Sequence, residues 1–145
     1  MDLQPAGFSL RFVAAFIDSV VILFVQYALS LVIILAVGVG RARFAMVLSA
    51  LVGLVAGALY YALMESSKRR GTLGKILVDI EVTDTDGFTL HLEEAIIRHL
   101  WRLVSFMTLG FGFAMAAWSR EGLALHDRMS GTRVVIKEEV FEEEE

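Results

Sequence analysis

Two long apolar runs constrain this chain more than any other feature of its sequence. The first extends from Phe12 to Val37 and the second from Phe44 to Met64. A helix rises about 1.5 Å per residue, so each run is long enough to cross roughly 30 Å of hydrocarbon. A soluble domain of 145 residues with 57% hydrophobic residues could not bury so much apolar surface. The short link between the runs therefore predicts an antiparallel transmembrane helical hairpin.

The remaining composition excludes several classes of function. The chain has no cysteine, which removes disulfides, thiolate catalysis and cysteine-based zinc sites. Its three histidines lack metal-ligand spacing, and no nucleophile–base pair can be assembled, so we expect neither an enzyme nor a bound metal or cofactor. The first apolar run is too long for the core of a signal peptide and is expected to remain as an anchor. A basic cluster at 68–75 lacks any nucleic-acid-binding motif and is typical of a membrane boundary.

Two stretches outside the apolar runs have the pattern of β-structure. Apolar residues alternate from Ile76 to Val82, and a turn at 84–87 leads into a possible return strand at 88–90. The run 132–137 is also rich in β-formers. We therefore predict a small cytoplasmic β-hairpin or sheet formed by about 75–90 and 132–137.

The segment from about 93 to 118 is predicted to be a third membrane element. A full crossing would divide the cations almost evenly between the two sides of the membrane. A return near Gly110–Gly112 would leave only Arg41 and Arg43 opposite all other cations, as the positive-inside rule favours. The expected fold is thus an all-α membrane protein with two transmembrane helices, a third short or re-entrant helical hairpin, and both termini in the cytoplasm.

Asp18 is the most unusual residue of the first predicted span, because a carboxylate inside a membrane helix is costly. Helical periodicity places Arg11 and Gln26 on the same stripe as Asp18, so this stripe must face protein or water. One interpretation is a protonatable carboxylate on a cation or proton path. The other is a buried polar seam in which Asp18 bonds Arg11, Arg98 or Arg102.

Small residues recur at every fourth position of the second predicted span. They are Ala45, Ser49, Gly53 and Gly57. This spacing allows two helix backbones to approach closely, so we interpret the stripe as a helix-packing face.

Four separated blocks of the sequence resemble the RDD family of bacterial membrane proteins, which is named for one arginine and two aspartates. The blocks are residues 7–18 (GFSLRFVAAFID), 72–75 (TLGK) with the following strand and turn, Arg98, and 125–135 (LHDRMSGTRVV). The resemblance extends from residue 7 to about 136 and identifies Arg11, Asp18 and Asp127 as the family's signature residues. We expect one membrane domain over 1–137, followed by an acidic disordered tail at 138–145.

The resemblance implies a multi-pass protein of the bacterial cytoplasmic (inner) membrane, some of whose relatives are proposed to exchange monovalent cations for protons. The leading hypothesis is therefore cation/proton exchange through Asp18, by a homo-oligomer that supplies the walls of a path. The alternative is a non-catalytic membrane scaffold or accessory subunit that binds a cytoplasmic partner. We expect Asp127 to organise the loops by pairing with Arg98 or Arg102.

Overall fold

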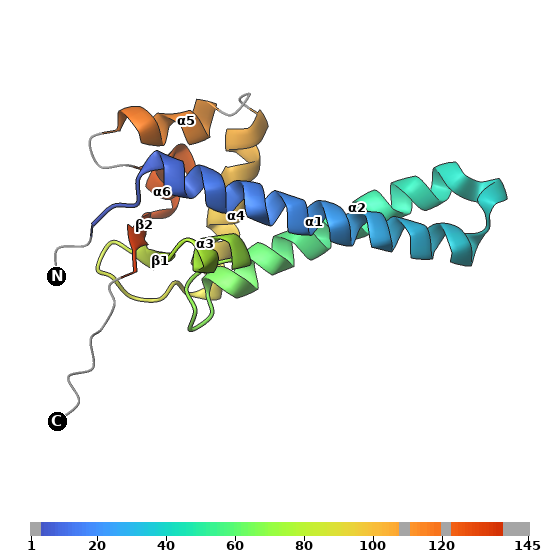
Figure 1. Cartoon of the computed structure of the whole chain (residues 1–145), viewed down its shortest axis with the longest axis horizontal. Coiled ribbons are helices and arrows are strands. Elements are labelled where there is room, and N and C mark those ends of the chain that lie inside the picture. The colour runs from blue at the N-terminus through green and yellow to red at the C-terminus, as the bar shows by residue number, and fades with distance from the viewer. Residues whose placement is uncertain (1–3, 108–110, 120–122, 138–145) are drawn as a thin grey trace.

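The computed structural model describes residues 4–107, 111–119 and 123–137, and the described chain is mostly helical with one small sheet (Figure 1). Two long helices, α1 (Phe8–Val37) and α2 (Ala42–Glu65), are joined by the short 3-10 helix η1 (Val39–Arg41). The remaining elements are α3 (Leu73–Leu77), β1 (Ile80–Asp84), α4 (Leu92–Met107), α5 (Phe111–Trp118), α6 (Leu125–Ser130) and β2 (Thr132–Ile136). The predicted tail at 138–145 lies outside the described residues.

Helices α1 and α2 form the predicted hairpin, which extends away from the rest of the molecule (Figure 1). They are the two helices of the described chain that are long and apolar enough to cross a membrane. Their side chains face outward along most of the hairpin, and Leu23, Phe24 and Leu54 are each more than half exposed. This outward apolar surface suits contact with acyl chains, and the two predicted spans are confirmed as long apolar helices.

A short polar contact joins the two helices beyond the middle of α1. Gln26 Nε2 donates to the carbonyl oxygen of Ser49 at 3.1 Å, and Ser30 Oγ donates to Ser49 Oγ at 3.1 Å. Ala45 and Ser49 are buried at this interface, and Gly53 lies under the Gln26 side chain. Gly57 differs from the other members of the small-residue stripe, because an added Cβ there would meet no neighbour within 4 Å.

The remaining elements and residues 4–7 gather at the open end of the hairpin, and we call this part the head (Figure 1). Its sheet pairs β1 with β2 in antiparallel register, with Val82 opposite Val134. Residues 4–6 cover the other edge of β2, because Ala6 N donates to Val134 O and Ile136 N donates to Gln4 O. The predicted β-run at 132–137 is thus confirmed, and the N-terminus closes the sheet edge.

The predicted hairpin over 75–90 is wrong in its first part and in its return strand. Residues 73–77 form helix α3 rather than a strand, and the strand begins only at Ile80. Residues 88–90 do not pair with β1 as a strand. The Asp84 carboxylate instead accepts hydrogen bonds from the backbone N–H groups of Asp86 and Phe88, which closes the turn locally. The partner of β1 comes from β2, at the far end of the chain.

The predicted third membrane element at 93–118 consists of two helices, α4 and α5. Helix α4 ends at Met107 and α5 begins at Phe111. The residues between them, Gly110 among them, lie outside the described part of the chain, so the return expected near Gly110–Gly112 stays a prediction. Gly112 belongs to α5. At 16 and 8 residues, α4 and α5 are each too short to span a bilayer as regular helices.

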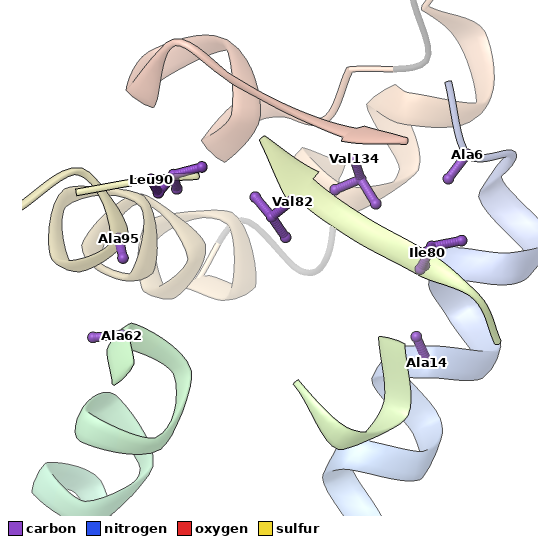
Figure 2. Packing of buried hydrophobic residues seen from close by; sticks show 8 residues of the cluster. All are labelled: Ala6, Ala14, Ala62, Ile80, Val82, Leu90, Ala95 and Val134. Carbon is purple, nitrogen blue, oxygen red and sulfur yellow. The ribbon is translucent and has the colours of Figure 1, made fainter. Parts of the chain in front are cut away.

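The apolar core lies in the head, between the sheet and the ends of α1, α2 and α4 (Figure 2). Figure 2 shows its members, which are Ala6, Ala14, Ala62, Ile80, Val82, Leu90, Ala95 and Val134. Half of them are alanine, so close approach of backbones rather than bulky side chains fills this core. So small a core leaves much of the cohesion of the head to polar contacts.

The glycine stripe of α2 provides a matched pair of variants. We expect Gly53→Leu to lower the stability of the hairpin by about 1–3 kcal/mol, because the new side chain must displace Gln26 from its bond to Ser49. Gly57→Leu should be neutral or slightly stabilising, because it meets open space and improves helix propensity. Thermal unfolding in detergent measures both, and equal effects of the two variants would contradict the packing described for Gly53.

Candidate functional site: a buried ion-pair network at the base of the hairpin

The network centres on Glu65, the last residue of α2, which is only 1% exposed. Its carboxylate accepts hydrogen bonds from three cations: Lys75 Nζ at 2.5 Å, Arg98 Nη1 at 2.8 Å and Arg102 Nη2 at 2.8 Å. Lys75 belongs to α3, and both arginines belong to α4. A carboxylate at a helix C-terminus is unfavourable next to the helix dipole, so the cations here compensate for both the burial and the dipole.

Arg98 connects Glu65 to a second buried carboxylate. Its Nη2 and Nε donate to Asp127 Oδ1 at 2.6 and 3.2 Å, and its side chain is 1% exposed. Arg11 donates from Nη1 to the other oxygen of Asp127. The guanidinium of Arg98 therefore lies between two carboxylates and joins α2, α4 and α6.

Local structure holds Asp127 in place. It is the third residue of α6, and its Oδ2 accepts the backbone N–H of Ala124 at 3.1 Å, which satisfies a donor at the start of the helix. Gly131 ends α6 in the left-handed conformation, with φ of 63°, and directs the chain into β2. Arg11 Nη2 then bonds the carbonyl oxygen of Val134 at 3.3 Å. Arg11 of α1 thus bonds both α6 and β2.

Asp18 belongs to a neighbouring set that contains no cation among its bonded partners. Its carboxylate, 1% exposed, accepts hydrogen bonds from Tyr60 Oη at 2.9 Å, Thr72 Oγ1 at 2.5 Å and the backbone N–H of Gly74 at 2.9 Å. The arginine partners considered for Asp18 in the seam interpretation are therefore wrong. Arg11, Arg98 and Arg102 pair with Asp127 and Glu65 instead.

These contacts give the Thr72–Lys75 motif (TLGK) a structural role. Thr72 and Gly74 bind Asp18, and Lys75 binds Glu65, so three of the four residues of this motif contact two carboxylates. Gly74 must lack a side chain, because an added Cβ would collide with the carbonyl oxygen of Ala14 in α1. Helix α3 can therefore lie directly against the α1 backbone.

Burial and charge oppose each other at the ionisable groups of the head. Burial lowers the pKa of Lys75 to about 7, although Glu65 favours the protonated form. Burial alone would raise the pKa of Asp127, but Arg98 and Arg11 hold it well below its usual range. Burial lowers the pKa of His126 far enough that its ring is neutral at neutral pH. Near pH 7, Lys75 is therefore a group of the network that changes charge.

The predicted site residues fall into three groups. Arg11, Arg98, Arg102 and Asp127 come together in the ion-pair network, whereas Asp18 has its own set of donors. Gln26 lies about 12 Å further along α1 than Asp18, and its side chain bonds Ser30 and Ser49 within the hairpin interface. Within the described residues, no group of three or more histidine or acidic side chains is placed to hold a metal ion.

Sequence reasoning missed Glu65, Lys75, Thr72 and Tyr60 as members of these contacts. Glu65 carries a usable signal, because it is an acid directly after the uncharged run that ends at Met64. An acid at that point requires a cationic partner. Lys75 was assigned to the boundary cluster with Lys68, which is exposed, whereas Lys75 is 7% exposed. Tyr60 and Thr72 carry no comparable signal, since their roles depend on the position of Asp18 in space.

Removal of Asp127 tests the network. We expect Asp127→Asn to lower the free energy of unfolding by about 3–5 kcal/mol at pH 7, because Arg98 and Arg11 lose their shared buried counter-ion. The exposed Asp86→Asn serves as the control and should be nearly neutral. Because the pKa of Asp127 is depressed in the folded state, the difference between wild type and variant should shrink only below about pH 4. Thermal unfolding in detergent across pH measures it, and a difference that disappears near neutral pH would contradict the pairing.

The buried lysine makes a separate prediction about pH. The Lys75 pKa is about 7 in the folded state and about 10.4 when unfolded, so the unfolded chain binds more protons between these values. Relative to Lys75→Met, the wild type should therefore gain stability as the pH rises from 7 to 10, by about 1.4 kcal/mol per pH unit. Lys68→Met, at an exposed position, is the control and should run parallel to the wild type. A Lys75→Met curve that also runs parallel would contradict the lowered pKa of Lys75 in the folded state.

Comparison with known proteins identifies the family of this chain. The model of the RDD family matches residues 5–131, a range that contains Arg11, Asp18, the TLGK motif and Asp127. The chain is 32% identical to the uncharacterized protein YxaI of Bacillus subtilis (strain 168) over 151 aligned positions, which cover 92% of this chain and 99% of the relative. No solved structure matches it. On the extent of the family match and of this relative, the chain belongs to the RDD family.

Proposed function

We propose that the chain is a non-catalytic membrane module, in which the α1–α2 hairpin is the anchor and the head is a rigid platform for a partner protein. The observation that carries this proposal is that the signature residues are hydrogen-bonded within the chain. Arg11, Asp18 and Asp127 all bond other elements of the same chain and connect the parts of the head to one another. Such bonds fix geometry, as a scaffold or accessory subunit requires.

The exposure of the hairpin supports the same proposal. No residue in the most apolar 18-residue stretch of α1 is buried. Within one chain, α1 packs on α2 along one side, and the rest of its surface is free to contact lipid. A route for ions needs polar groups enclosed on all sides. An α1–α2 pair alone supplies one wall of such a route, so transport would require a second copy or another subunit to complete it.

Charge supports an orientation with the head in the cytoplasm. Arg41 and Arg43 are close to the turn of the hairpin, whereas all other described lysines and arginines belong to the opposite end of α1 and α2 or to the head. Cytoplasmic segments carry the excess of lysine and arginine in bacterial membrane proteins. In this orientation the platform and the described ends of the chain face the cytoplasm.

The second candidate is monovalent cation/proton exchange, and Asp18 favours it. This residue is a fully buried carboxylate within an apolar helix, and two of its three bonded donors are hydroxyl groups that can also accept a hydrogen bond. Intramembrane carboxylates commonly mark proton relays. The two candidates differ in what the removal of the Asp18 charge does.

Purified protein reconstituted in liposomes distinguishes the candidates. Under the scaffold proposal, a sodium or potassium gradient should move no more protons than in protein-free liposomes. Asp18→Asn should lower the free energy of unfolding by about 1–3 kcal/mol, because its amide places a donor against the donors of Tyr60, Thr72 or Gly74. Asp86→Asn again serves as the neutral control.

The opposite pattern would favour exchange. Cation-driven proton flux well above the empty-liposome level, lost in Asp18→Asn but kept in Asp86→Asn, would overturn the scaffold proposal if the variant remains as stable as the parent. Unfolding of the Asp18→Asn variant would also abolish the flux. Thermal unfolding measured on the same preparations distinguishes this cause from loss of the carboxylate.

A further inference from the structure

Helix α4 has its polar side buried and its apolar side exposed, the reverse of a helix in a soluble protein. Arg98, His99 and Ser105 are buried against the rest of the head. The opposite side of the helix exposes large apolar residues. These are Ile96 (44%), Ile97 (46%), Leu100 (56%), Leu103 (39%), Val104 (40%) and Met107 (82%). An apolar stripe of this length on one side of a helix requires an apolar partner.

The orientation of α4 limits what that partner can be. The helix runs across the direction of α1 and α2, at the base of the hairpin (Figure 1). Its polar side contacts α6 through Arg98–Asp127 and Ser105–His126, and these contacts belong to the head. If α1 and α2 stand upright in a membrane, α4 therefore lies near the plane of the membrane surface.

We propose that α4 is an interfacial helix that lies in the membrane plane, with the Ile96–Met107 side inserted among the upper acyl chains. Continuity of surface selects the bilayer over other partners: α1 and α2 already expose apolar residues to it, and α2 packs directly against α4. Helices of this kind are held at the boundary between headgroups and acyl chains by one apolar side and a polar side away from the lipid. In this chain the polar side faces the ion-pair network instead of water, so the bilayer and Glu65 hold α4 from its two sides.

The position of α4 at the membrane surface has a consequence for either proposed function. Arg98 and Arg102 lie on α4, so movement of this helix relative to the bilayer pulls directly on Glu65 and Asp127. The state of the membrane surface is thereby coupled mechanically to the head. This inference depends only on α1 and α2 being membrane spans, and it does not require the scaffold proposal to be correct.

Depth measurements with spin labels test the proposal directly, because the chain has no native cysteine. Single cysteines at Ile96, Leu100, Leu103 and Met107 share one side of α4 and extend over about 16 Å of its axis. Each nitroxide-labelled variant is reconstituted in phosphatidylglycerol–phosphatidylethanolamine vesicles. The ratio of its accessibility to oxygen and to a water-soluble nickel chelate then gives its depth.

Labels at Leu23, in the middle of α1, and at Asp86, in an exposed turn, provide the deep and aqueous references. For a helix in the membrane plane, all four α4 labels should give depths within about 4 Å of one another, between the two references. A steady change in depth of about 16 Å from Ile96 to Met107 would show an upright helix and overturn the proposal. Accessibility equal to that of Asp86 would also overturn it, by assigning the face to water.

A second copy of the chain is the remaining occupant, and the same samples identify it. Dipolar broadening between labels that disappears when labelled protein is diluted with unlabelled protein would assign the α4 face to an interface between copies. Spectra unchanged by dilution, together with uniform depth, support the bilayer. Thermal unfolding of each variant confirms that the labelled proteins are folded, and exposed positions on this side of α4 are expected to tolerate the label.

Discussion

The structure depends on one guanidinium group placed between two buried carboxylates. Arg98 contacts Glu65 at the end of α2 and Asp127 in α6, so it connects the anchor to the head. A buried ion pair is not in itself strongly stabilising, because desolvation offsets much of its attraction. Its value here is specificity: lipid gives two helices no hydrophobic reason to associate, and the core of the head is largely alanine and valine. Charge and hydrogen-bond geometry therefore select this arrangement over other compact ones.

The network also explains why residues far apart in the chain form one signature. Arg11 and Asp127 are 116 positions apart, yet they bond across the head, and Thr72 reaches Asp18 over 54 positions. These contacts join α1 to α6 and β2, α3 to α1 and α2, and α4 to α2 and α6. Loss of Glu65 or Asp127 leaves buried cations without their carboxylate partner, which costs more than the bonds themselves contribute. The chain therefore has few ways to rearrange the head by small steps.

Sequence could predict those parts of the molecule that local pattern determines. The two long apolar helices and the β-run at 132–137 follow from composition and periodicity. The strand predicted from Ile76 was wrong because the alternation of apolar residues there is overridden by Asp18, which holds the Gly74 N–H at the start of a helical turn. The partners of Asp18 were wrong for a related reason. Helical angles place residues on a face of their own helix, but they do not reveal that α3 folds back against α1.

The distribution of charge within the head changes how its ionisable residues are understood. Four cations, Arg11, Lys75, Arg98 and Arg102, share two carboxylates, Glu65 and Asp127, in the ion-pair network. Buried excess charge is costly, and among these cations lysine is the one that can lose its proton readily in proteins. Burial is the main cause that lowers the pKa of Lys75 to about 7, and Arg98 and Arg102 add to it against the attraction of Glu65. Release of the proton reduces the excess charge while both arginines keep Glu65 paired. The residue that the sequence pattern groups with the surface cations is thus a buried member of the contact between the hairpin and the head.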